Sequence, residues 1–460
     1  MNLGILVLAA GKGTRMKSET PKALHAAAGR SLMAWTFTNL GPLDATETVV
    51  VVGDGAAAVT AEIPQGVAHA VQDPQIGTGD AVRVGLEALS DSIDTILVMP
   101  VDMPLLRSAT VQEVLATQSA SGNAATVLAA LVGDPTGYGR VLRDRDSVVG
   151  IVEERDAAEE QLAIREINTS VYAFDRSRLE TALGGLDTDN TQGEYYLTDA
   201  IRLLAAAGAK VGAVVTDESE SLGVNDHAQL AAAGAELRRR INEGLMADGV
   251  AMLDPSRVYV DAGVRVAPGA RLYPDVYLQG ATTVGADAEV GPNVHASDTV
   301  IGDGATVRWA VLDRAAVGNQ ASVGPFTYLR PEAELQERTK AGAFVEIKNS
   351  IVGPGSKVPH LSYVGDTDIG EESNIGAGTI TVNYDGFAKH RTKIGDRVRI
   401  GSDTMLVAPV EIGDDAYTGA GSVITENVAP GALGLERSQQ QEIEGYAERR
   451  KRRAAEDGDG

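Results

Sequence analysis

An aliphatic residue, replaced once by threonine, returns at every sixth position over two long stretches of this 460-residue chain. The repeated positions are Val260, Val266, Leu272, Leu278, Val284 and Val290, then Ile394, Ile400, Leu406, Ile412, Thr418 and Ile424. A period of six belongs to neither an α-helix nor a single β-strand. It is typical of a parallel β-helix, in which each hexapeptide forms one flat face and its aliphatic side chain points inward.

Composition and charge exclude several classes of protein. The chain has 40 basic against 64 acidic side chains, a net charge of −24, which argues against nonspecific binding of nucleic acid. It contains no cysteine, which excludes disulfides, cysteine nucleophiles and thiolate metal sites. The longest apolar stretches, such as residues 3–10, have the length of a strand, and no signal peptide opens the chain. We expect a cytoplasmic protein of two or three domains without a membrane span.

A glycine-rich and basic segment follows the strand predicted at residues 3–10. It reads Gly11-Lys12-Gly13-Thr14-Arg15-Met16-Lys17, and Pro21-Lys22 comes shortly after. Glycines let backbone N–H groups approach an anion, and lysine and arginine neutralise its charge. Neither the dinucleotide fingerprint nor the Walker pattern is complete. A plain glycine turn is the alternative, but the nearby cations favour a phosphate loop.

Strand-like runs at residues 48–52 and 96–99 alternate with helical patterns at 81–89 and 109–117. This alternation predicts a doubly wound α/β sheet, in which ligands bind beyond the carboxyl ends of the strands. Asp102 stands at such an end. Its carboxylate could hold Mg²⁺ against a nucleotide phosphate, or it could cap a helix before Pro104; the motif alone leaves both open.

The segment from Leu8 to Met16 with Pro21-Lys22 resembles the signature of sugar-1-phosphate nucleotidyltransferases. Further matching residues follow in that family's order: Gln72, Gly77-Thr78-Gly79, Asp102, Tyr138-Gly139-Arg140, Glu153, Asn168-Thr169 and Gly223-Val224-Asn225. Residues of the β-helix resemble an acetyltransferase: Arg330, Glu346-Ile347-Lys348, His360-Leu361-Ser362-Tyr363, Asn374-Ile375-Gly376-Ala377-Gly378 and Asn383-Tyr384-Asp385-Gly386. Over nearly its whole length the chain is therefore similar to the bifunctional N-acetylglucosamine-1-phosphate uridylyltransferases and glucosamine-1-phosphate N-acetyltransferases.

The resemblance implies a Rossmann-like nucleotidyltransferase domain followed by a left-handed parallel β-helix. We expect the first domain at residues 1–226, a linker helix at 227–247, the β-helix at 248–437 and a basic helix and tail at 438–460. The basic run at the end of the chain is typical of a solvated helix end, with a binding patch as the alternative. Members of the family are homotrimers whose acetyl sites lie between neighbouring β-helices.

For uridylyl transfer, the resemblance implies that UTP and N-acetylglucosamine 1-phosphate react in the first domain. Arg15 and Lys22 would stabilise charge on the triphosphate, and Asp102 and Asn225 would hold Mg²⁺. The remaining residues expected to contact the nucleotide sugar are Leu8, Ala9, Ala10, Gly11, Gln72, Gly77, Thr78, Gly139, Glu153 and Asn168. Asp80 stands where the family pattern leads us to expect histidine.

For acetyl transfer, the amine of glucosamine 1-phosphate must lose a proton before it attacks acetyl-CoA, and histidine suits that step. Among six histidines, only His360 has a supporting setting. By resemblance, Glu346 would orient His360, and the sugar phosphate would be bound by Arg330, Lys348, Tyr363 and Asn374. The residues expected to contact acetyl-CoA are Asn383, Tyr384, Ser402, Ala420 and Arg437.

The hexapeptide rhythm breaks over residues 382–393, which predicts an extruded loop. Its basic residues favour binding of anionic substrates across a subunit interface over a tolerated insertion. Together these features imply an enzyme that acetylates glucosamine 1-phosphate and then forms UDP-N-acetylglucosamine for bacterial cell-wall precursors. The alternatives are a nucleotidyltransferase whose β-helix only oligomerises, and a noncatalytic assembly protein; His360 and the phosphate loop, respectively, argue against them.

Overall fold

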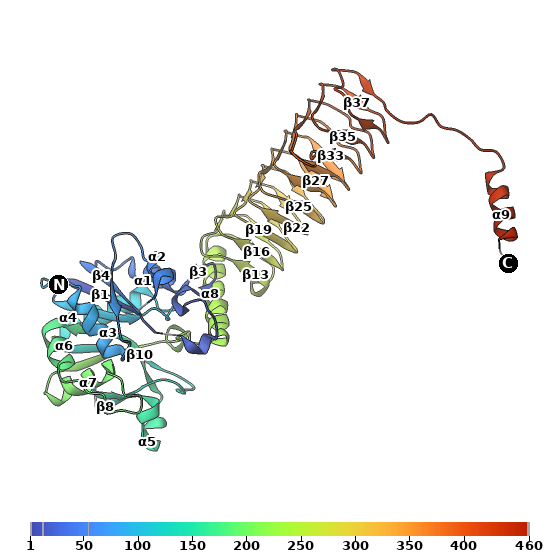
Figure 1. Cartoon of the computed structure of the whole chain (residues 1–460). Helices are drawn as coiled ribbons and strands as arrows, with labels where there is room; N and C mark the ends of the chain where they lie inside the picture. Colours follow the sequence, from blue (N-terminus) through green and yellow to red (C-terminus); the bar gives the residue numbers. More distant parts are fainter. Residues whose placement is uncertain (1, 12, 54, 458–460) are drawn as a thin grey trace. The chain divides into compact units, whose positions relative to one another are not determined.

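The computed structural model describes residues 2–11, 13–53 and 55–457, and Lys12 of the predicted phosphate loop lies outside them. The chain divides into two compact units, Met1–Ile241 and Asn242–Gly460. The division falls inside helix α8, His227–Ala247, and each unit is described by itself. Figure 1 shows a layered α/β fold in the first unit and a stack of flat coils in the second.

The first unit is built on a mixed sheet with the strand order β11-β7-β10-β6-β1-β4-β5. Its strands are β1 Leu3–Ala9, β4 Glu47–Gly53, β5 Ala68–Gln72, β6 Thr95–Pro100, β7 Ala125–Leu131, β10 Glu166–Asp175 and β11 Val211–Thr216. Strands β1, β4, β5 and β6 pair in parallel, whereas β10 runs antiparallel to β6 and β7. A hairpin of β8, Arg140–Asp144, and β9, Ser147–Val152, extends the sheet beside β10. Strands β2, Ala26–Ala27, and β3, Arg30–Ser31, form a separate pair.

Helices cover both faces of this sheet, as the doubly wound prediction requires (Figure 1). They are α1 Leu32–Leu40, α2 Ala57–Ala61, α3 Thr78–Glu87, α4 Ser108–Ser121, α5 Glu159–Leu162, α6 Arg176–Leu183 and α7 Leu197–Ala206. Alternate residues of β1 enter different cores: Leu6 packs with residues of α3, α6 and α7, and Ile5 packs with residues of α1 and α4. Because successive side chains of a strand point to opposite faces, a strand buried on both sides is apolar throughout, like β1.

The second unit is a left-handed parallel β-helix with three faces. The first face contains β12 Ala251–Met252, β15 Arg271–Leu272, β18 Glu289–Val290, β21 Thr306–Val307, β24 Ser322–Val323, β27 Lys340–Ala343 and β30 Lys357–His360. The second contains β13 Val258–Val260, β16 Val276–Gln279, β19 Val294–Ser297, β22 Ala310–Asp313, β25 Thr327–Leu329, β28 Glu346–Lys348, β31 Tyr363–Gly365, β33 Ile380–Val382, β35 Met405–Val407 and β38 Val423–Ile424. The third contains β14 Arg265–Val266, β17 Thr283–Val284, β20 Val300–Ile301, β23 Ala316–Val317, β26 Ala333–Leu335, β29 Ser350–Val352, β32 Thr367–Ile369, β34 Thr392–Ile394 and β36 Val410–Ile412. Strands β37, Tyr417–Thr418, and β39, Leu433–Gly434, pair with each other near the end.

The interior of the β-helix is continuous between the two stretches of perfect hexapeptides. Leu278 lies in register with Ala296, then Leu312, Leu329, Ile347 and Val364 in successive coils, and all six are buried. Some steps between neighbouring interior positions are five residues long, such as the one from Leu312 to Val317, so a strict six-residue count loses phase there. Of the repeated positions in the two stretches, only Val266 is half-buried rather than buried.

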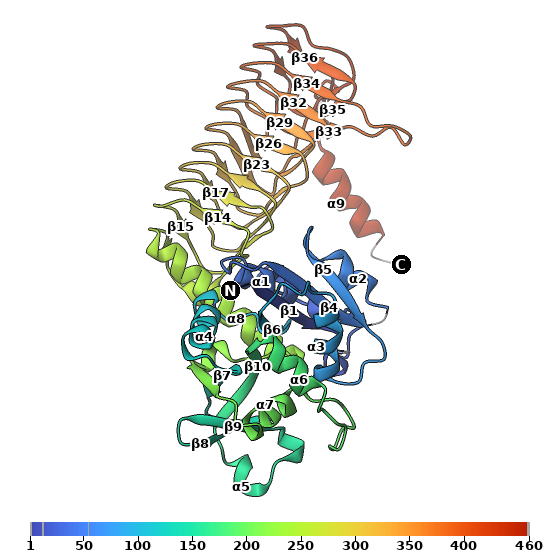
Figure 2. The ribbon, with the colours of Figure 1, turned by 90° about the vertical axis from the view of Figure 1, so that its left-hand side faces the viewer.

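The break at residues 382–393 is an ordered hairpin between β33 and β34, and Figure 2 shows it leaving the coil stack beside β33. Tyr384 pairs with Lys389 in antiparallel fashion, and His390 N donates to Asn383 O at 2.8 Å. The carboxylate of Asp385 accepts backbone N–H groups of Phe387 and Ala388, which shapes the tip. The exposed helix α9, Tyr446–Glu456, lies close to the end of the chain. Within the described residues, no helix combines the length and apolarity needed to cross a bilayer.

Because the coils stack closely, replacing a glycine on a face of the β-helix should affect stability differently from replacing a glycine on α8. A Cβ on Gly342 would overlap the carbonyl oxygen of Pro359 in the next coil, whereas a Cβ on Gly244 of α8 meets nothing within 4 Å. We expect Gly342→Ala to destabilise the protein by about 1–3 kcal/mol through overpacking. Gly244→Ala should instead stabilise it by roughly 0.5–1 kcal/mol through helix propensity. Thermal unfolding of both variants measures this, and equal shifts in Tm would contradict the packing argument.

Candidate active sites

One large cavity of the first unit opens at the carboxyl ends of its parallel strands and has a volume of about 660 Å³. Every residue that the sequence nominates for uridylyl transfer lines it: Leu8, Ala9, Ala10, Gly11, Arg15, Lys22, Gln72, Gly77, Thr78, Asp102, Gly139, Glu153, Asn168 and Asn225. They come from the end of β1 and the loops after it, the end of β5 and the segment leading into α3, the segment after β6, the residues flanking the hairpin β8–β9, strand β10 and the approach to α8. Ligands of open α/β sheets bind at this edge, because the loops that follow parallel strands converge there.

Lys22 brings a positive charge between two oxygen-bearing side chains of the cavity. Its ammonium pairs with the carboxylate of Asp102 and donates to Asn225 Oδ1 at 2.8 Å. Asp102 and Asn225 are adjacent because Val224 N donates to the backbone oxygen of Asp102 at 2.9 Å. Gly13 lets the glycine loop approach Lys22, since a Cβ there would lie 2.8 Å from Lys22 Cβ. The helix-cap alternative for Asp102 is wrong, because α4 begins at Ser108 with Arg107 as its N-cap residue.

Asp80, which replaces the expected histidine, holds the side chain of Gln72. Gln72 Nε2 donates to Gly77 O and to Asp80 Oδ2, both at 2.9 Å, and Asp80 also pairs with Arg83 at 3.0 Å. A glutamine amide nitrogen has two hydrogens, so both are engaged. Gln72 Oε1 accepts no hydrogen bond from the described part of the chain, and this side chain can therefore offer a ligand only an acceptor.

Glu153 and Asn168 form a further part of the cavity wall. Thr198 Oγ1 donates to Glu153 Oε1 at 3.2 Å, and burial raises the pKa of the Glu153 carboxyl. Asn168 Nδ2 donates to the buried Tyr172 hydroxyl at 2.7 Å, and Asn168 Oδ1 accepts from Ser170 N. Polar groups that can bond to sugar hydroxyls are thus held in place, Asn168 by its own strand β10 and Glu153 by Thr198 of α7.

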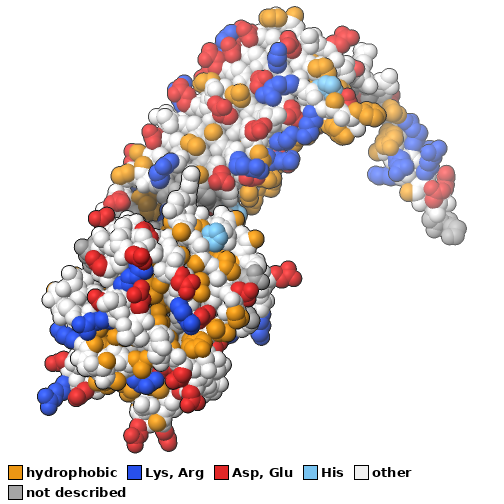
Figure 3. All heavy atoms as spheres, turned by 60° about the vertical axis from the view of Figure 1, so that its left-hand side comes forward, with side chains coloured by type: hydrophobic (Ala, Val, Ile, Leu, Met, Phe, Trp, Pro, Cys, Tyr) orange, Lys and Arg blue, Asp and Glu red, His pale blue; other side chains and the backbone are white. Residues whose placement is uncertain are grey.

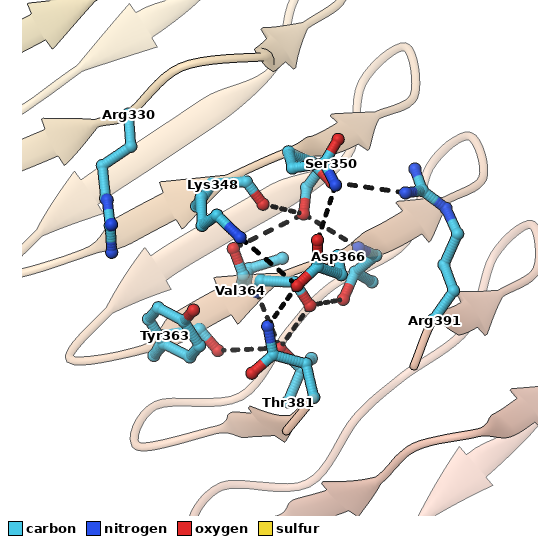
Figure 4. Close-up of polar contacts among 12 residues, drawn as sticks. Arg330, Lys348, Ser350, Tyr363, Val364, Asp366, Thr381 and Arg391 are labelled. Carbon is cyan, nitrogen blue, oxygen red and sulfur yellow. Dashed lines mark hydrogen bonds and ion pairs between the residues drawn. The ribbon is translucent and has the colours of Figure 1, made fainter. Parts of the chain in front are cut away.

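On the β-helix, three of the predicted phosphate-binding residues lie together on the second face. Figure 4 shows Arg330, Lys348 and Tyr363 on neighbouring coils. Lys389 of the hairpin lies close to Lys348, and this neighbouring ammonium lowers the pKa of Lys389. Arg330 Nη1 donates to Glu346 Oε1 at 2.8 Å. In Figure 3, Lys and Arg side chains gather along a strip of the β-helix, although the chain as a whole is acidic. Clustered cations of this kind attract anions electrostatically.

Two other predicted residues of the acetyl site lie elsewhere. Asn374 pairs with Lys357 and Arg399, which continues the first face rather than the second. His360 is exposed at the end of β30, and its imidazole forms no hydrogen bond with any residue that the structure describes. The expectation that Glu346 orients His360 is not met within one chain, because the carboxylate of Glu346 bonds to Arg330 instead.

The residues expected to contact acetyl-CoA form two groups. Ser402 and Ala420 occupy the same corner of successive coils, where Gly421 N donates to Ser402 O at 2.8 Å. Arg437 joins this corner, since its Nη1 donates to Ala420 O at 3.0 Å. Asn383 and Tyr384 lie apart from it, at the base of the hairpin, and Asn383 is almost fully buried.

Comparison with known proteins agrees with this division into two transferase units. The family described as MobA-like NTP transferase domain matches residues 5–161, and the bacterial transferase hexapeptide family matches residues 391–426. A relative from Streptomyces avermitilis named bifunctional protein GlmU is 51% identical, with 97% of this chain and 94% of the relative aligned. Proteins of the same name from Streptomyces coelicolor and Mycolicibacterium vanbaalenii are 50% and 48% identical, over 97% of this chain and 94% and 93% of theirs.

The chain belongs to the bifunctional GlmU family. It is therefore a multifunctional transferase, with a nucleotidyltransferase unit followed by a hexapeptide acyltransferase unit. The sequence reasoning missed Asp366, a buried carboxylate behind the predicted phosphate-binding cluster of Arg330, Lys348 and Tyr363. No local motif marks Asp366, because its partners lie 17 or 18 residues away in neighbouring coils. The sequence gives a weak indication that Lys389 is functional, since this residue lies in the basic segment that interrupts the repeat.

The raised pKa of Glu153 predicts a pH-dependent cost in stability. Because the folded protein holds this proton more tightly than the unfolded chain, stability falls as pH rises through the folded-state pKa. Glu153→Gln, which cannot ionise, should raise Tm relative to the wild type at pH 8 and leave it nearly unchanged at pH 4. Thermal unfolding at both pH values measures the difference. A Glu153→Gln protein whose Tm shift is the same at pH 4 and pH 8 would refute this origin.

Proposed function

We propose that this chain acetylates glucosamine 1-phosphate with acetyl-CoA and then transfers UMP from UTP to the resulting N-acetylglucosamine 1-phosphate. The products would be UDP-N-acetylglucosamine, a bacterial cell-wall precursor, and pyrophosphate. The observation that carries the proposal is the cavity of the first unit, which gathers every nominated uridylyl-site residue, in a chain that belongs to the bifunctional GlmU family. The cytoplasmic location expected from the sequence stays a prediction.

Uridylyl transfer is an in-line displacement that needs positioning and charge stabilisation rather than a protein nucleophile. An oxygen of the sugar phosphate attacks the α-phosphorus of UTP, and the bond to pyrophosphate breaks. Lys22 and Arg15, which line the cavity beside the glycine loop, supply positive charge for the triphosphate. Gln72 offers an acceptor suited to the N3–H of uracil, because Asp80 and Gly77 engage its amide hydrogens. Glu153 and Asn168 offer polar atoms to the sugar hydroxyls.

The donor set around Lys22 also fits Mg²⁺. Oxygens of Asp102 and Asn225 converge on the Lys22 ammonium, and this arrangement supports a cation site between them. One carboxylate and one amide oxygen leave most coordination positions to phosphate oxygens and water, which is how Mg²⁺ usually binds with nucleotides. Bound there, the ion would neutralise charge on the triphosphate. Lys22 would then be free to turn its ammonium toward a phosphate oxygen.

For acetyl transfer, we assign His360 as the base that accepts the proton of the attacking amine. A carbon–nitrogen bond forms at the thioester carbonyl, and the bond to the sulfur of CoA breaks. Arg330, Lys348 and Tyr363 would bind the sugar phosphate together with Asn374, and Asn383, Tyr384, Ser402, Ala420 and Arg437 would contact acetyl-CoA. The exposed imidazole of His360 is free to approach a substrate amine.

We propose a homotrimer in which the acetyl site is shared between chains. Asn374 lies on the first face and Lys348 on the second. A site that uses both residues is therefore more easily formed between two neighbouring β-helices than within one chain. An apolar ladder at the corner between these faces supports this arrangement: Trp309, Phe326, Phe344 and Leu361, each 45–61% exposed with φ between 50° and 57°. Bulky residues rarely adopt positive φ, and an exposed apolar stripe marks a contact surface. The ladder ends beside His360.

Separate sites predict a double dissociation between the two reactions. Lys22→Ala should abolish uridylyl transfer and spare acetyl transfer, because Lys22 lies in the cavity of the first unit. His360→Ala should do the reverse, since it lies on the β-helix. Each reaction is assayed separately with its own substrates on the same purified protein. Loss of both reactions in Lys22→Ala, with the fold intact, would mean that the two units do not act separately.

The metal assignment predicts a large loss of activity when its carboxylate is removed. Asp102→Ala should lower uridylyl transfer by at least ~100-fold, the usual scale for one electrostatic contributor. The loss should persist at saturating Mg²⁺, and acetyl transfer serves as the internal control. Full Mg²⁺-dependent activity in Asp102→Ala would contradict the assignment.

The shared acetyl site predicts complementation between two inactive chains. His360→Ala and a variant at Arg437 should each lose acetyl transfer when tested alone. Unfolding, mixing and reassembling the two should restore part of the activity in mixed trimers, because some sites then combine intact residues from different chains. Mass in solution is measured on the same samples. A monomer with full acetyl transfer would rule out the shared site.

A further inference from the structure

Two acidic side chains hold the base of the hairpin that interrupts the β-helix. Asp366 directly precedes β32 and Asp368 lies within it, on the coil before the hairpin. Asn383, where the hairpin leaves the coil, donates its amide to the Asp366 carboxylate, and the backbone oxygen of Asp366 accepts Thr392 N at 3.1 Å where the hairpin returns. Asp366 therefore contacts both ends of the hairpin.

Asp368 secures the returning end through a second interaction. The guanidinium of Arg391 binds the Asp368 carboxylate through two donors, with Nε donating to Oδ2 at 2.6 Å. Arg391 Nη1 also donates to Asn349 O at 3.4 Å, and Asn349 Nδ2 in turn donates to Asp366 Oδ1 at 2.5 Å. Asn349 thus links Arg391 to Asp366, and Figure 4 shows these last two side chains in the polar network of this part of the β-helix.

The same carboxylate of Asp366 reaches the phosphate-binding cluster. Lys348 Nζ lies 3.5 Å from Asp366 Oδ2, and an ammonium with three donors keeps two of them for an anion. Asp366 is only 5% exposed, and burial pushes its pKa upward. Hydrogen bonds from Asn349, Asn383 and Lys348 outweigh that burial and hold the pKa below its ordinary value, so the group stays charged.

Gly365 allows these groups to meet. A Cβ at this position would overlap the Tyr363 hydroxyl and would lie 2.8 Å from Asn383 Nδ2. Tyr363 of the phosphate-binding cluster and Asn383 of the hairpin thus lie on either side of a residue without a side chain. The hairpin in turn places Lys389 beside Lys348.

We propose that Asp366 and Asp368 form an acidic clamp that fixes the hairpin and thereby sets the spacing between its residues Tyr384 and Lys389 and the cations of the second face. The inference rests on the proposed acetyl transfer and adds two positioning residues to it. Neither carboxylate touches substrate in this assignment. They hold the hairpin and the second face of the β-helix in the one arrangement that binds both anionic substrates.

The chain offers a matched control for the clamp. Arg397 binds Asp415 through two donors, at 2.8 and 3.0 Å, with both side chains exposed as in the Arg391–Asp368 pair. Asp368→Asn and Asp415→Asn each remove one such pair and should change Tm by the same small amount. Only Asp368→Asn and Asp366→Asn should raise KM for glucosamine 1-phosphate and acetyl-CoA, by about 10-fold or more. Uridylyl transfer should be unchanged in all three variants.

A second readout does not depend on acetyl transfer. Trypsin should cut after Lys389 and Arg391 faster in Asp366→Asn and Asp368→Asn than in the wild type or Asp415→Asn, because the hairpin is released. If the wild-type protein shows no acetyl transfer, the proposed function is wrong. The proteolysis result then tests the clamp by itself. Unchanged cleavage with KM values within about twofold of the Asp415→Asn control would overturn the clamp. If Asp366→Asn fails to fold, the measurements on Asp368→Asn, a substitution of an exposed side chain, test the clamp alone.

Discussion

Parallel pairing between strands decides where the functional side chains of both units lie. In the first unit, β1, β4, β5 and β6 run in parallel, so the segments that follow them open on the same cavity. In the second unit, each residue stacks on its counterpart in the next coil, so that Glu346 follows Tyr328 and precedes Tyr363 on the second face. A functional group in either unit is therefore placed by register rather than by closeness in sequence.

This dependence on register explains what could be predicted from the sequence. The interior repeat and the glycine loop are local patterns, and both predict the fold and the position of the first cavity correctly. The interior continues through five-residue steps, such as that from Leu312 to Val317, which a count of six cannot follow. The pairing of Glu346 with Arg330 and the contact of Asp366 with Asn383 join different coils, and neither has a signature within a short segment.

Both units gather positive charge at their candidate sites, although the chain as a whole is strongly negative. The net charge is −24, yet Lys22 and Arg15 line the cavity, and Arg330, Lys348 and Lys389 gather on the β-helix. In each place an acidic or amide side chain holds a lysine: Asp102 and Asn225 hold Lys22, and Asp366 holds Lys348. The pairing with Asp366 orients Lys348 before an anionic substrate arrives, which lowers the cost of ordering this lysine on binding.

The most direct test of the account supplies the purified chain with glucosamine 1-phosphate, acetyl-CoA, UTP and Mg²⁺ and follows the products by mass spectrometry. Two transferase units on one chain predict UDP-N-acetylglucosamine, pyrophosphate and free CoA, with no nucleotide sugar when acetyl-CoA is left out. A parallel reaction starts from N-acetylglucosamine 1-phosphate and needs only UTP and Mg²⁺. Product in that reaction alone would contradict acetyl transfer by the β-helix. Product in neither would contradict uridylyl transfer by the first unit, and the absence of free CoA as well would contradict the assignment of both units.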